Sequence, residues 1–110
     1  MTFNNDTTMT NYPAVRMYNF NNSNGSDFLQ DNLVSLGAIN NRQAGIVQIM
    51  DYSATDKHKT LLFRGGGPAT GVGASATRWS NTAAITSIKL INTAGTLDTG
   101  FTLTLYAVIS

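Results

Sequence analysis

The feature that most constrains the fold is a period of two residues in the side chains of 101–109. Phe, Leu, Leu, Ala and Ile occupy the odd positions, and Thr, Thr, Tyr and Val occupy the even positions. Such alternation is typical of a β-strand with two different faces. Residues 84–91 alternate in a similar way, and residues 92–100 connect the two stretches. We therefore expect these stretches to form an antiparallel pair of strands.

The polar composition extends this expectation to the whole chain. Thr, Asn, Gly and Ser make up 45 of the 110 residues, and all six acidic residues are Asp, with no Glu. Thr favours pleated strands, whereas Asn, Gly, Ser and Asp favour turns. The residues that favour helices are correspondingly scarce. The composition therefore predicts an all-β chain, and 110 residues are enough for one domain.

Further strands are predicted along the chain, separated by turn-forming stretches. They cover residues 12–20, 45–52, 58–64 and 77–79, with turns at 21–27 and 53–56 and a long glycine-rich loop at 65–76. Residues 28–39 allow either an irregular strand or a helical turn. About seven short strands at this spacing favour a single antiparallel β-sandwich or jelly roll over 12–110. Its expected core residues are Ile49, Trp79, Ile85, Ile88, Phe101, Leu103 and Leu105.

Residues 1–11 contain neither a strand period nor a helical period. They consist mainly of Thr, Asn and Asp, with one aromatic residue and two Met. We expect them to form a flexible, extended N-terminal arm that becomes ordered on docking to a partner. Phe3, Met9 and Tyr12 are the side chains expected to anchor this arm.

Charge and cysteine content exclude several classes of function. Seven basic and six acidic residues give a net charge of +1, which is too small to attract nucleic acid. Without cysteine the chain has no disulfides and no thiolate metal site. No apolar run approaches the ~20 residues that span a bilayer, so no membrane partner is expected. No signal segment opens the chain, which points to synthesis in the cytoplasm.

The residues that could support chemistry have simpler structural roles. His58 is the only histidine, and the charges of the neighbouring Lys57 and Lys59 would repel a bound cation. The stretch 51–56 resembles only part of a calcium loop, because the glycine and the terminal glutamate are missing. The glycine-rich stretch lacks the Gly-Lys-Ser/Thr sequence and following helix of a phosphate loop. We therefore expect no enzymatic activity, no cofactor and no metal.

Trp79 has two possible roles. It could stack on a sugar ring, or it could fill the core between the sheets, and the second role is favoured because a small β-domain needs its largest apolar side chain inside. The glycine-rich loop is a second candidate for an interaction site, because its glycines and its proline could contact a protein or a glycan. These residues are Gly65, Gly66, Gly67, Pro68, Gly71 and Gly73.

Residues 45–110 resemble a module found in tailed-bacteriophage virion proteins. The resemblance rests on VQIMDY at 47–52, KHKT at 57–60, the glycine-rich stretch at 65–76, RWSNTAAITSI at 78–88 and FTLTLYAVI at 101–109. Ala107 stands where this module usually has Gly. The resemblance implies a jelly roll or β-sandwich and a structural protein of the virion.

The chain lacks the repeats and coiled coil that usually accompany fibre modules. It is therefore more similar to a capsid decoration (cement) protein, a homo-oligomer on the outer capsid surface that contacts the major capsid protein lattice. On this hypothesis, removal of residues 1–11 abolishes capsid binding and leaves the fold intact. The alternatives are a tail or fibre-tip adhesin that binds a host glycan and, less favoured, a small glycoside-processing enzyme.

Overall fold

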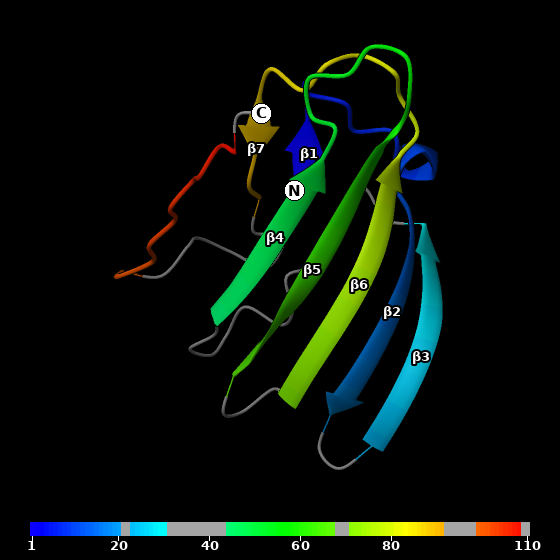
Figure 1. Cartoon of the computed structure of the whole chain (residues 1–110). Helices are drawn as coiled ribbons and strands as arrows, with labels where there is room; N and C mark the ends of the chain where they lie inside the picture. Colours follow the sequence, from blue (N-terminus) through cyan, green and yellow to red (C-terminus); the bar gives the residue numbers. More distant parts are fainter. Residues whose placement is uncertain (21–22, 31–43, 68–70, 92–98, 109–110) are drawn as a thin grey trace.

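Two antiparallel sheets form the regular part of the chain, as seen in a computed structural model. The structure describes residues 1–20, 23–30, 44–67, 71–91 and 99–108. The larger sheet has five strands in the order β3-β2-β6-β5-β4, and the smaller sheet pairs β1 with β7 (Figure 1). The predicted all-β class is confirmed, and the two sheets are consistent with a β-sandwich. The elements are β1 (Thr2–Phe3), the 3-10 turn η1 (Met9–Asn11), β2 (Pro13–Phe20), β3 (Ser23–Gln30), β4 (Ala44–Met50), β5 (Lys59–Gly67), β6 (Gly71–Trp79) and β7 (Ile88–Lys89).

The stretch 65–76, expected to be a loop, largely continues strands β5 and β6. The two strands remain paired from Lys59 opposite Trp79 to Gly67 opposite Gly71. The glycines serve close packing here: a Cβ atom on Gly65 would lie 2.8 Å from Cζ of Phe63 and 2.7 Å from the Ala44 carbonyl oxygen. The missing side chain at this position therefore makes room for an aromatic ring and a neighbouring strand.

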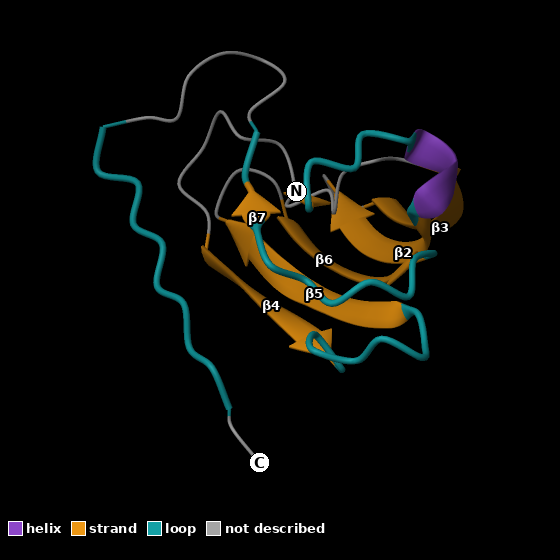
Figure 2. Cartoon of the chain, turned by 90° about the horizontal axis from the view of Figure 1, so that it is seen from above, coloured by secondary structure: helices purple, strands orange, loops and turns teal. Residues whose placement is uncertain are grey.

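The predicted flexible arm is not confirmed, because residues 1–12 are folded against the larger sheet. Strand β1 pairs with β7, with Phe3 opposite Ile88. The side chains of Phe3 and Tyr12 are fully buried, whereas Met9 is half exposed. Seen from above in Figure 2, β7 and η1 lie on the same side of the curved five-stranded sheet. The apolar inner face of that sheet needs a cover, and the N-terminal residues provide part of it.

The core lies between this cover and the inner face of the larger sheet. Phe3 packs against Trp79 with ring centroids 5.5 Å apart. Trp79 is buried, as expected, and Ile49 and Ile85 pack against the core while remaining partly exposed. The fully or nearly fully buried apolar residues of this cluster are Met1, Phe3, Tyr12, Leu61, Phe63 and Trp79.

Four residues expected in the core lie at the surface instead. Ile88 is 39% exposed and Phe101 is 51% exposed. Leu103 and Leu105 are 65% and 76% exposed. The segment that carries the last three is extended but pairs with none of the described strands, so the predicted strand and its pairing with 84–91 are corrected. Alternation alone does not form a strand, because a strand also needs a partner for its backbone hydrogen bonds.

Residues 84–91 also differ from the expected strand, since only Ile88 and Lys89 are in a ladder. Nearby backbone groups bond elsewhere: the amide of Ile85 donates to the Tyr52 carbonyl at 2.7 Å. The rest of the stretch 28–39, beyond the end of β3, lies outside the described residues. The described part of the chain contains no helix long and apolar enough to cross a membrane.

Candidate interaction surface

The larger sheet has an apolar surface on its outer face, opposite the core. Successive side chains of a strand point to opposite faces, so the neighbours of the buried Leu61, Phe63 and Trp79 point outward. Met17 is 66% exposed and Phe28 is 61% exposed on this side. We define the outer face by its exposed large apolar side chains, which are Val15, Met17, Phe28, Ile46, Met50, Leu62 and Val72.

The strand register joins these side chains into one continuous surface. Phe28 lies opposite Val15 in the β2–β3 ladder. Ala76 lies opposite Val15 on one side and opposite Leu62 on the other. Met17, Ala74, Arg64 and Ile46 form a second row across four strands. Monomeric proteins rarely expose contiguous apolar patches larger than a few hundred Å², so this face has the character of an interaction site.

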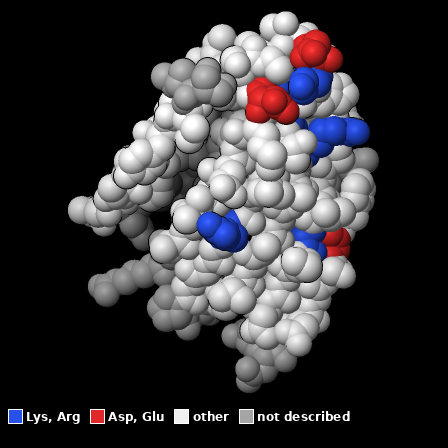
Figure 3. Space-filling model, in the orientation of Figure 1, with Lys and Arg blue, Asp and Glu red and all other residues white. Residues whose placement is uncertain are grey.

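Few charges interrupt the outer face, and those that do are basic. Among the described residues that point outward from the sheet, the charged ones are Arg64 and Arg78, and none is acidic. In the space-filling view, the surface over β4, β5 and β6 is mostly uncharged, with isolated charged side chains (Figure 3). A partner surface that is apolar and carries a carboxylate opposite each arginine would complement this pattern.

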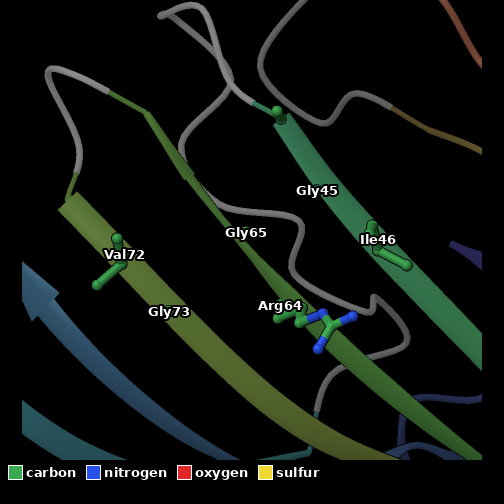
Figure 4. Close-up of a pocket in the computed structure, with 7 residues that line it drawn as sticks. Gly45, Ile46, Arg64, Gly65, Val72 and Gly73 are labelled. Atoms are coloured by element: carbon green, nitrogen blue, oxygen red, sulfur yellow. The ribbon is translucent and has the colours of Figure 1, made fainter.

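Two shallow hollows lie in the outer face. The first is bordered by Ile46, Arg64 and Val72, which come from three neighbouring strands, with glycines between them (Figure 4). The second lies near the other end of the sheet and is bordered by Val15, Phe28 and Arg78. Both are open and lined mainly by apolar atoms, so each could receive an apolar side chain of a partner protein.

An ion pair on the inner side of the sheet joins β2 and β3, the two strands that carry Val15 and Phe28. The guanidinium of Arg16 donates two hydrogen bonds to the Asp27 carboxylate, at 2.6 and 3.0 Å, and lies 5.1 Å from the centre of the Tyr18 ring. This donation by Arg16 lowers the pKa of Asp27 below its ordinary value. The two residues lie directly opposite each other across β2 and β3, so their ion pair fixes the register of the outward residues.

The site residues expected from the sequence are placed differently from the expectation. Gly65, Gly66 and Gly67 end β5, and Gly71 and Gly73 begin β6, whereas Pro68 lies outside the described residues. Phe3 and Tyr12 belong to the core and cannot anchor a free arm, while Met9 remains available at the surface. Trp79 is fully buried and cannot stack on a sugar. In the portions of the chain that the structure describes, no cluster of three or more His, Asp or Glu residues could hold a metal ion.

A period of two residues does not reveal the outer face, because β4 and β5 do not alternate. They contain consecutive apolar residues instead, as in Ile46-Val47 and in Leu61-Leu62-Phe63. Consecutive apolar residues in a strand indicate that both of its faces are apolar. These consecutive residues are the signal in the sequence that indicates the outer face.

Comparisons with known proteins identified no relative of this chain. No protein family matches the chain, no curated protein matches its sequence, and no solved structure matches its fold. A functional proposal therefore rests on the outer face and on the expectation, drawn from the sequence alone, that residues 45–110 are a virion module.

Proposed function

We propose that the chain is a structural protein of a tailed-bacteriophage virion, and specifically a capsid decoration protein on the outer surface of the head. The observation that carries the proposal is the continuous, exposed apolar outer face of the larger sheet. A surface of this kind suits attachment to another protein. The likeness of residues 45–110 to virion modules supplies the class of partner, a coat-protein lattice.

The anchoring surface in this proposal is the outer face and not the N-terminal arm. Phe3 and Tyr12 are buried in the chain's own core, so their side chains are already occupied. Val15, Met17 and Phe28 are each more than half exposed and lie on two paired strands. Many weak contacts of this kind add up when a lattice presents the same site repeatedly.

The glycan-binding alternative depends on Trp79 as its main aromatic residue, which would have to be exposed. Trp79 is enclosed in the core, whereas Tyr52 and Tyr106 are exposed to 43% and 84%. Neither tyrosine lines a hollow of the outer face. Within the described residues, no aromatic side chain therefore forms a sugar site together with Trp79.

A charged substitution on the outer face tests the proposal. Met17→Asp places a carboxylate at a position that is 66% exposed, so the fold should persist. We expect its apparent affinity for capsids that lack this protein to fall by about 10- to 100-fold, because a buried interface would have to desolvate the new charge. Co-sedimentation with capsids measures the affinity, and circular dichroism checks the fold.

The matched control is Thr55→Asp, which adds the same charge at an exposed position in the turn after β4. It should bind capsids as the unchanged chain does. Equal binding by both variants would refute attachment through the outer face. Labelling of the protein on intact particles tests the location separately, since a label on the tail or no label at all contradicts a place on the head.

A further inference from the structure

The segment 99–108 is an extended chain with an unusual amount of exposed apolar surface. Tyr106 is 84% exposed and Val108 is 88% exposed, and Leu103 and Leu105 are 65% and 76% exposed. The segment from 101 to 108 contains no charged residue and no proline. Figures 1 and 2 both show it running apart from the larger sheet. It therefore has the sequence of a β-strand and the exposure of an unpaired one.

Strand β4 forms one edge of the larger sheet in the part of the chain that the structure describes. This strand pairs with β5 through seven residue pairs, and no described strand pairs with its other side. Natural proteins usually protect such an edge with lysines, prolines or a very short strand. Strand β4 is seven residues long and has neither charge nor proline, and its inward-facing Val47 and Ile49 remain only partly buried.

We infer that segment 99–108 of one copy of this chain adds to the open edge of β4 in a second copy, so that the protein is a strand-exchanged oligomer. Eight to ten extended residues span the length of a seven-residue strand. Phe101, Leu103 and Leu105 share one face of the segment. On that edge they would lie beside Val47 and Ile49 and close the core there.

The opposite face of the segment fits the same arrangement. Tyr106 and Val108 would lie beside Ile46 and extend the outer face of the sheet. The side chains that would enter the core, Phe101, Leu103 and Leu105, present on the order of 400 Å² per copy, given 51–76% exposure and ~150–250 Å² for a large side chain. Each docked segment would also cover a similar area of the edge that receives it, so reciprocal exchange between two copies would reach the ~1,200–2,000 Å² of a specific interface. Uncharged residues on both sides mean that no charge has to be desolvated.

A second copy is favoured as the partner over the segment's own chain. Within one chain the segment is already extended, yet its side chains bury little surface against the described residues. Exchange of identical elements between copies is a common route to closed oligomers, because each copy supplies both the strand and the edge. The inference does not depend on which external surface the protein binds.

The first test compares charged substitutions on the two sides of the segment in the full-length chain. Leu103→Asp and Leu105→Asp place a carboxylate on the side that would enter the core, whereas Thr102→Asp and Thr104→Asp place it on the other side. We expect the unchanged chain to be oligomeric at micromolar concentration and the leucine variants to dissociate about 100-fold more readily. The threonine variants should stay within about tenfold of the unchanged chain.

Native mass spectrometry and light scattering over a concentration series measure this association. All of these substitutions lie in a segment that is exposed within one chain, so every variant should keep the two sheets, and circular dichroism should still show a β-rich fold. An unchanged chain that remains monomeric at about 100-fold higher concentration overturns the inference. Equal effects of leucine and threonine substitutions would also overturn it.

The second test identifies the edge and the copy. The chain has no cysteine, so engineered cysteines are the only thiols. Gln48→Cys in one preparation is mixed with Thr104→Cys or Thr102→Cys in another, which allows for either register, and the mixture is mildly oxidised. We expect a disulfide-linked dimer of unlike chains on a non-reducing gel.

The double variants Gln48→Cys/Thr104→Cys and Gln48→Cys/Thr102→Cys distinguish the two possible acceptors. Under the inference they form products linked between chains. A crosslinked monomer would show that the segment docks on its own chain and would overturn the inference. An oligomeric sample without any linked dimer from either position would overturn docking at β4.

Discussion

Trp79 and Asp6 are joined by a hydrogen bond although 73 residues separate them in the sequence. The indole nitrogen of Trp79 donates to a carboxylate oxygen of Asp6 at 2.8 Å. The Tyr12 hydroxyl donates to the backbone carbonyl of Asp6 at 2.9 Å and accepts from the amide of Phe3 at 3.1 Å. These bonds attach the N-terminal residues to the larger sheet, which is why residues 1–12 do not behave as an arm.

Asp6→Ala should destabilise the fold without exposing new apolar surface. The substitution leaves the indole N–H of Trp79 without its acceptor and also removes the partner of Asn11. An unsatisfied buried donor costs about 1–3 kcal/mol, so we expect the free energy of unfolding to fall by that amount. Urea denaturation followed by Trp79 fluorescence measures it. Asp56→Asn, at an exposed position, is the control and should change stability by less than about 0.5 kcal/mol.

The same carboxylate should make stability depend on pH in the acid range. Burial raises the pKa of Asp6, but hydrogen bonds from Trp79, Asn11 and Thr8 together lower it by more, so the pKa lies below its ordinary value. A carboxylate with a lowered pKa stabilises the fold above its unfolded pKa, and this contribution is lost as the pH falls below about 4. Asp6→Asn should flatten this acid limb in denaturation curves recorded from about pH 7 to about pH 3. An unaltered limb would exclude Asp6 as its source.

Composition predicted the all-β class correctly, and local patterns located β2, β4 and β5 to within a few residues. Two other expectations were wrong for a common physical reason. The glycines of 65–73 favour loops in isolation, but at Gly65 the close approach of Phe63 and a neighbouring strand requires a residue without a Cβ atom. Residues 1–11 have no period because short, irregular segments can cover a core through single side chains such as Phe3. Both outcomes depend on tertiary contacts that no local pattern contains.

The opposite error occurred at the end of the described chain. Residues 101–108 have a strong strand pattern but pair with none of the described strands. The alternation of 101–109 predicted a core strand, yet Leu105 is 76% exposed. A sequence can identify a strand-forming segment, but it does not say which copy provides the neighbouring strand. The outer face was missed for a different reason, because consecutive apolar residues such as Leu61-Leu62 predict a strand but do not say what covers each of its two faces.

A comparison of Asn4→Ala with Asn5→Ala isolates the contribution of the Asn4 side chain to stability. Both residues have positive φ angles, 50° and 58°. Asn tolerates this left-handed conformation better than Ala, so the backbone cost of the substitution should be similar at the two positions. The carboxamide oxygen of Asn4 accepts from the backbone amides of Thr86 and Ser87, and its nitrogen donates to the Ala84 carbonyl. Asn5 is exposed.

We therefore expect Asn4→Ala to lose about 1–3 kcal/mol more than Asn5→Ala. Thermal denaturation of the two variants measures the difference. Amide hydrogen exchange should also be faster at Thr86 and Ser87 in the Asn4 variant, because their backbone amides lose their acceptor. Equal stabilities would mean that the bonds from Asn4 contribute nothing net to the attachment of β1.

Gly65→Ala and Gly73→Ala test the close packing of the β5–β6 hairpin. A Cβ atom on Gly65 would overlap the Phe63 ring and the Ala44 carbonyl, whereas on Gly73 its nearest neighbour is the Met17 carbonyl oxygen at 3.5 Å. Overpacking of this kind costs about 1–3 kcal/mol, so Gly65→Ala should lower the free energy of unfolding by that amount. Gly73→Ala should be neutral or slightly stabilising because alanine restricts the unfolded chain. If the two variants unfold at the same urea concentration, the glycines have no packing role.

Lys59 is a fully buried lysine whose hydrogen bonds join the turn at 54–57 to the segment that follows Trp79. Its ammonium donates to the carbonyl oxygens of Ala54, Lys57 and Thr82 at 2.6, 3.0 and 2.8 Å, and lies 5.9 Å from the Trp79 ring centre. Lys59→Met keeps the length of the side chain but leaves these carbonyls without their donor. We expect a loss of about 2–3 kcal/mol in the free energy of unfolding, measured by urea denaturation.

Lys57→Met is the matched control for Lys59→Met, because Lys57 is exposed and its replacement removes the same charge. It should change stability by less than about 0.5 kcal/mol. Trp79 is the only tryptophan, so its emission should shift in the Lys59 variant and stay constant in the control. A Lys59 variant as stable as the control, with unchanged emission, would show that the buried ammonium does not fix the turn at 54–57 to the segment that follows Trp79.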